Sequence, residues 1–110
     1  MWRLGQLWLK FKEWAWPYRT LIVIDGDGLP AILPTRDLVL LTDDGEPWSV
    51  AMMCPCGCGQ LVELPLLREV RPRWSLQVDK KNRPTLHPSV WLHDGCRSHF
   101  FVRRGKVEWV

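Results

Sequence analysis

The chain has 110 residues, about the length of one domain, and 46 % of them are hydrophobic, which excludes a wholly disordered protein. Its net charge of +3, from 15 basic and 12 acidic residues, is too small to indicate nucleic-acid binding by itself. No apolar run approaches the roughly 20 residues of a membrane-spanning helix, and charged residues interrupt the apolar N-terminus, unlike in a signal peptide. We therefore expect a cytoplasmic protein with reduced cysteines.

Residues 1–17 are predicted to form an amphipathic, tryptophan-rich helix, set apart from a single domain over residues 18–110. Leu4, Leu7 and Phe11 recur at helical spacing, and Pro17 would end the helix. This helix either packs on its own domain or docks on a partner or a membrane surface. Most of the eight tryptophans in the chain are expected to fill the core.

Beyond the helix, short runs of β-branched and aromatic residues alternate with turn residues. These runs predict strands over residues 21–24, 38–41, 48–53, 61–64, 74–78, 89–92, 99–102 and 106–110. Many short strands joined by tight turns predict a mainly β fold: a small antiparallel sheet, a sandwich or a partial barrel.

Three of the four cysteines lie in the stretch MCPCGCG, and the fourth, Cys96, stands three residues before His99. Proline and glycine allow a tight turn that aims sulfurs to one side, so two such corners predict a tetrahedral site of the kind that Zn²⁺ prefers. A tetrahedral metal ion has four coordination positions, and the sequence offers five candidate ligands: Cys54, Cys56, Cys58, Cys96 and His99. We expect Cys96 and His99 to bind, together with Cys54 and Cys56, with Cys58 as the rival within the first corner.

Other readings of the cysteines stay open. Thiolate and imidazole ligands also suit iron, and the cysteines could be buried thiols without a metal or a redox pair. Four protein ligands would make the metal structural, whereas three would leave a place for a catalytic water.

The stretch RPTLHPSVWLHDGC contains the remaining chemistry. Pro84 and Pro88 predict a rigid loop before a strand, in which Thr85 and Ser89 bridge backbone groups. The sharper interpretation makes Ser89 a nucleophile, with His87, His93 or His99 as its base, although no GxSxG elbow is present.

The order of these motifs resembles a small bacterial and phage family of unknown function. The similarity rests on CPCGCG, Trp74, PTLHPSV and the C-x-x-H-F segment, and it runs from about residue 28 to the C-terminus. Some relatives of that family are encoded beside ubiquitin-like modifiers and their E1- and E2-like enzymes. The resemblance implies a role in ubiquitin-like conjugation or deconjugation, with a peptidase as one option, and partners among the modifier and these enzymes. Some relatives have C-x-x-C in the first corner, where this chain has C-x-C-x-C.

Three functions follow. The first is a zinc-binding, β-rich accessory protein that binds or processes a ubiquitin-like modifier. The second is a small peptidase or hydrolase that uses the metal or Ser89, with Asp79, Asp94 or Glu63 as a base near the metal. The third, a nucleic-acid-binding module, rests on a basic run that is more typical of a solvated surface. That run comprises Arg68, Arg71, Arg73, Lys80, Lys81 and Arg83.

Overall fold

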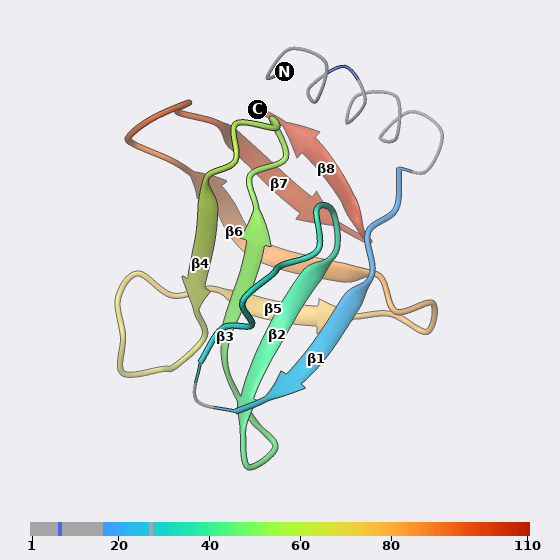
Figure 1. The fold of residues 1–110 in the computed structure, drawn as a ribbon, viewed down its shortest axis with the longest axis vertical. Helices are drawn as coiled ribbons and strands as arrows, with labels where there is room; N and C mark the ends of the chain where they lie inside the picture. Colours follow the sequence, from blue (N-terminus) through green and yellow to red (C-terminus); the bar gives the residue numbers. More distant parts are fainter. Residues whose placement is uncertain (1–6, 8–16, 27) are drawn as a thin grey trace.

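The computed structural model describes Leu7 and residues 17–26 and 28–110, so the helix predicted for the N-terminus lies, Leu7 apart, outside the described residues. The described part forms two four-stranded sheets that face each other (Figure 1). The first sheet contains, in spatial order, β1 (Leu21–Asp25), β2 (Leu38–Asp43), β3 (Glu46–Met53) and β4 (Leu61–Pro65). The second contains β5 (Ser75–Val78), β6 (Pro84–Trp91), β7 (His99–Arg103) and β8 (Lys106–Trp109). The mainly β class is thus confirmed.

The core lies between the two sheets and draws on both of them. Val50 and Met52 of β3 are buried together with Phe100 and Val102 of β7. Along β7, these two buried residues alternate with side chains that reach the opposite, outer face. The inner face of the second sheet is therefore part of the apolar core, and the side chains on its outer face are free to contact solvent or a ligand.

Two tight hairpins have the backbone that their sequences predict. The β2–β3 turn has Asp44 and Gly45 at φ angles of 51° and 80°, and the β7–β8 turn has Arg104 and Gly105 at 49° and 79°. Two consecutive positive φ angles are typical of the two-residue hairpin turns that match strand twist. A Cβ at position 105 would lie 2.5 Å from the carbonyl oxygen of Arg19, so this position also needs glycine for space.

The structure differs from the sequence prediction in three ways. First, β1 pairs with β2 in parallel, whereas all other strand pairs are antiparallel. Second, the predicted loop at Pro84 and Pro88 belongs to β6: one proline begins the strand and the other lies in a bulge, two places where a strand tolerates the missing N–H.

Third, the tryptophans of the described residues are not core residues. Trp48 and Trp74 are half-buried, and Trp91 and Trp109 are exposed. Aliphatic side chains, with Met52 and Phe100, fill the space between the sheets, and Trp74 packs against this core. No helical segment of the described part is long and apolar enough to cross a bilayer.

Candidate active site

The two cysteine corners meet at one end of the sandwich. The first corner is the turn between β3 and β4, closed by hydrogen bonds from the Cys54 N–H to the Gln60 carbonyl and from the Gly57 N–H to the Cys54 carbonyl. Gly57 and Gly59 both have positive φ angles, which let the chain fold back tightly enough for alternate cysteines to face one centre. The second corner, with Cys96, precedes β7.

The four cysteine sulfurs form a compact cluster. The ligand atoms of Cys54, Cys56, Cys58 and Cys96 all lie within 4.8 Å of one another, and none of these cysteines is in a disulfide. The Cys54 sulfur is 3.5 Å from that of Cys56 and 3.6 Å from that of Cys96. With Zn–S bonds of about 2.3 Å, a sulfur tetrahedron has edges of about 3.8 Å, so the cluster has the dimensions of a four-cysteine metal cage.

The thiols of this cluster differ in acidity. Burial raises the pKa of Cys54 and that of Cys58. Burial acts in the same direction on Cys96, but hydrogen bonds with Ser98 and with neighbouring thiols outweigh it, and the pKa of Cys96 falls to about 6. Four sulfurs this close cannot all ionise without a cation between them, because like charges oppose each other's ionisation. The cluster therefore suits a metal ion.

Ser98 joins the cluster to the start of β7. Its hydroxyl lies 3.1 Å from the sulfur of Cys96 and 3.6 Å from that of Cys54, and its carbonyl accepts a hydrogen bond from the N–H of Leu92. The next residue is His99. Consecutive strand residues point to opposite faces, so Ser98 faces the cysteines while His99 faces outward.

His99 contacts a serine instead of joining the sulfur cluster. Its Nε2 lies 3.0 Å from the Oγ of Ser89, which is hydrogen-bonding distance. The cluster of four cysteines does not include His99, which had been expected to pair with Cys96 as a ligand. Cys58, expected as a rival within the first corner, lies in the cluster instead.

A bulge in β6 brings Ser89 to this position. The register of β6 on β7 shifts between Leu86, opposite Val102, and Val90, opposite Phe100. Four residue steps on β6 thus match two on β7, and the extra backbone contains Pro88 and Ser89. Bulges re-aim side chains and recur beside active sites. The Trp74 indole N–H donates a hydrogen bond to the Ser89 carbonyl and steadies the bulged segment.

The indole of Trp91 stacks on the imidazole ring of His99. Its ring lies parallel to that of His99, with centroids 4.8 Å apart and an interplanar angle of 6°. His93 packs against Trp91 at 4.9 Å, tilted by 41°. Within the described residues, no aspartate or glutamate side chain hydrogen-bonds to the His99 ring. The sequence predicts that Trp91 and His99 lie in two neighbouring strands. Only the register of these strands, in which the two residues are cross-strand partners, shows that their rings meet.

The other residues predicted to act lie apart from this pair. Thr85 bridges backbone as expected, because its Oγ1 accepts a hydrogen bond from the N–H of Arg104. Asp79 shapes the β5–β6 turn by accepting hydrogen bonds from the N–H groups of Lys81 and Arg83. In the basic run, the guanidinium of Arg71 donates to backbone carbonyls of its own loop.

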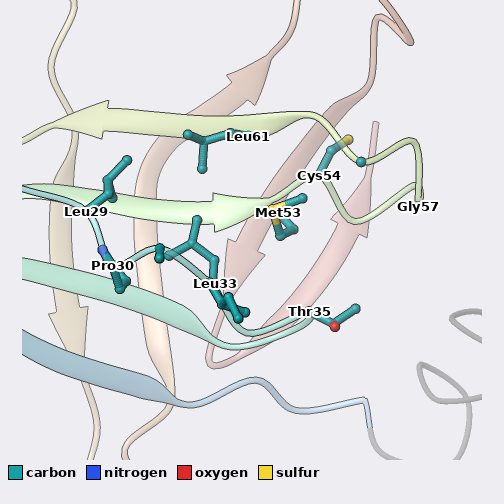
Figure 2. Close-up of a pocket in the computed structure, with 11 residues that line it drawn as sticks. Leu29, Pro30, Leu33, Thr35, Met53, Cys54, Gly57 and Leu61 are labelled. Atoms are coloured by element: carbon teal, nitrogen blue, oxygen red, sulfur yellow. The ribbon is translucent and has the colours of Figure 1, made fainter.

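An apolar pocket lies on the first sheet, between its loop 29–35 and the ends of β3 and β4 (Figure 2). Its volume is about 490 Å³, and Leu33, Met53 and Leu61 contribute to its lining. Cys54 also borders it, so the pocket adjoins the cysteine turn. The Ser89–His99 pair belongs to the second sheet.

Serine hydrolases contain a serine that is hydrogen-bonded to a histidine, as Ser89 is to His99 here. A family model described as "Bacterial ubiquitination-like system serine protease (BubE)" matches residues 26–110. The chain belongs to the BubE family. The predicted link to ubiquitin-like conjugation is thereby confirmed, and the match begins close to the residue expected. No curated protein and no solved structure matches the chain.

Proposed function

We propose that this BubE-family chain is a serine protease that processes a ubiquitin-like modifier or releases it from conjugates, with Ser89 as nucleophile and His99 as general base. The observation that supports this most directly is the 3.0 Å contact between Ser89 Oγ and His99 Nε2. The family description supplies the reaction class and the biological system.

The reaction follows from the properties of these two groups. Ser89 Oγ attacks the scissile carbonyl carbon while its proton passes to His99 Nε2. His99 then protonates the leaving amine, the carbon–nitrogen bond breaks, and an acyl ester remains on Ser89. A water molecule attacks this ester, His99 takes one of the water protons, and the proton returns to Ser89 Oγ as the carboxylic acid leaves.

Trp91 has the positioning task that a carboxylate has in a Ser-His-Asp triad. Its parallel indole restricts rotation of the His99 ring and keeps Nε2 toward Ser89. An indole face also attracts the imidazolium that forms during the reaction. The site is therefore proposed to operate as a dyad supported by stacking.

We propose that the cysteine cluster binds Zn²⁺ as a structural ion. Four thiolates fill a tetrahedral shell and leave no position for a catalytic water, which favours the serine mechanism over a metal-based one. The zinc would hold Cys96 and Ser98 and thereby the start of β7, which positions His99. Such a cage suits a reducing compartment such as the bacterial cytoplasm.

The test is covalent labelling with a fluorophosphonate, which reacts with activated serines. Wild-type protein should gain one adduct by intact mass spectrometry, and peptide mapping should place it on Ser89. Ser89→Ala and His99→Ala should abolish labelling while Ser75→Ala, a matched serine of the same sheet, retains it. Labelling that persists in Ser89→Ala would overturn the proposed mechanism.

A further inference from the structure

The outer face of the second sheet extends beyond the Ser89–His99 pair. On β7, Phe101 and Arg103 alternate with the buried Phe100 and Val102 and so lie on the same face as His99. Their partners on β8 are Glu108 and Lys106, respectively, and cross-strand partners share a face. One continuous surface therefore leads from His99 toward the β7–β8 turn.

A positively charged cleft occupies the far end of this surface. It has a volume of about 640 Å³, and its lining includes four basic residues and one carboxylate. The residues that line it are Tyr18, Gln77, Arg83, Thr85, Arg103, Arg104, Lys106 and Glu108. The positive charges exceed the negative ones, although the whole chain is only mildly basic.

The contacts within the cleft keep several of its cations close together. The guanidinium of Arg83 lies 3.6 Å from the ring centroid of Tyr18, and the Lys106 ammonium lies 5.5 Å from the same centroid. Cation–π contact with one aromatic ring keeps both positive charges near Tyr18. Arg103 pairs with Glu108 at 2.8 Å, so this carboxylate offsets only part of the positive charge. Such a cluster favours an anionic ligand.

The position of the cleft relative to the dyad determines what kind of anion it meets. His99 and Arg103 are four residues apart on β7, or about 13 Å at the rise of a strand. An extended peptide of four residues spans the same distance. A polypeptide whose scissile carbonyl lies at Ser89 and which follows β7 therefore places its fourth residue over the cleft.

We propose that this cationic cleft is a substrate subsite that binds an acidic side chain about four residues from the scissile bond, on the acyl side. The inference rests on the proposed function, because it requires a polypeptide that is cleaved at Ser89. The acyl side is chosen because, in a modification system, the modifier is the part that all conjugates share. A subsite that binds the modifier can therefore select every conjugate of the system.

The test uses short peptides that carry a C-terminal thioester, which supplies an acyl group to Ser89 without any other recognition. One series has Glu at each of the second to sixth residues from the thioester, and a matched series has Gln. Glu at the fourth residue should raise kcat/KM about five- to tenfold over Gln, as expected for a few surface charge pairs. The preference should decline as ionic strength rises, because salt screens exposed charges.

Variants locate the effect in the cleft. Arg104→Gln combined with Lys106→Gln removes two of its cations and should abolish the preference, whereas Arg68→Gln combined with Arg73→Gln, an equal charge loss outside the cleft, should keep it. Glu108→Gln removes the competing carboxylate and should strengthen it. Circular dichroism and fluorophosphonate labelling check that each variant is folded and has an intact dyad.

Three results would overturn the inference, and they are distinguishable. Ser89-dependent hydrolysis at equal rates for the Glu and Gln peptides would refute the subsite and leave the proposed function standing. If the peptides are not hydrolysed and Ser89 is not labelled, both the subsite and the proposed function fail. A preference that survives Arg104→Gln with Lys106→Gln would place acid recognition elsewhere and refute this cleft.

Discussion

The cysteine cluster and the Ser89–His99 pair meet at neighbouring residues, since Ser98 contacts the sulfurs and His99 contacts Ser89, yet they are built differently. The cluster is formed mainly by one short turn, in which three cysteines alternate with small or rigid residues. The pair is formed by two strands, with a bulge in one of them. The alternation of strand side chains separates the two sites, since Ser98 faces the sulfurs and His99 faces outward.

Under the proposed function, this comparison teaches that one segment can stabilise the fold through one residue and support chemistry through the next. The cluster fixes the backbone where β7 begins, and the pair uses a side chain from the next position. Changes in the pair should therefore affect catalysis alone, whereas changes in the cluster should affect metal content and stability first and catalysis as a consequence.

The largest expected effect is on catalysis alone. Ser89→Ala should lower kcat/KM by at least about a thousandfold, because it removes the nucleophile of the reaction. The free energy of unfolding should change little, since the hydroxyl is only part-buried. Thioester hydrolysis measures the first quantity and urea denaturation the second, with Ser75→Ala as the control. Loss of folding instead of activity would mean that Ser89 is a structural residue.

The complementary change affects the cluster. Cys96→Ser should release the metal and lower the free energy of unfolding by about 3 kcal/mol or more, because binding energy at a structural zinc site is folding energy. Activity should fall as a consequence, since Ser98 and His99 lose their anchor. Metal analysis and chemical denaturation measure these effects.

His99→Ala is the decisive partner of that experiment. The protein should retain its metal and its stability while losing activity, because His99 contacts Ser89 and the four sulfurs complete the cage. Native mass spectrometry gives the metal content. A variant that loses zinc would show that His99 is a ligand and would remove the distinction between the two sites.

A smaller effect is expected at Trp91. Trp91→Ala should lower kcat about tenfold with little change in KM, because stacked aromatic rings contribute on the order of 1 kcal/mol to orienting His99. Trp91→Phe should recover most of the loss, since a phenyl ring also stacks. A change in KM alone would indicate that Trp91 contacts substrate and does not position the histidine.

The smallest effect concerns protons at the cluster. Because the pKa values of Cys54 and Cys58 are raised and that of Cys96 is about 6, metal uptake by the apoprotein near pH 7 should release protons from Cys54 and Cys58 and few from Cys96. Affinity should therefore fall as the pH falls, since protons compete with metal for the sulfurs. Calorimetry in buffers of different ionisation enthalpy counts the protons. Release of four protons per metal ion, one for each cysteine, would contradict the assignment.

Local sequence signals predicted much of the secondary structure, because they act over a few residues. Seven of the eight strands in the described part begin and end within two residues of their expected positions, whereas the strand expected at 89–92 covers only the end of β6. The glycine turns at 45 and 105 have the positive φ angles that such hairpins need. The prolines of β6 misled the prediction, since a proline at a strand start or bulge has the same local signature as one in a loop.

The sequence by itself determined that the fold is mainly β and that three cysteines can face one centre. It also showed that the chain contains a serine and histidines that could serve as nucleophile and base. These properties depend on side-chain chemistry and on turns of a few residues. Only the tertiary structure decided that β1 and β2 run parallel, that Cys58 lies in the cluster, and that His99 contacts Ser89. Each of these depends on how distant strands pair, and a single bulge in β6 changes which side chains meet.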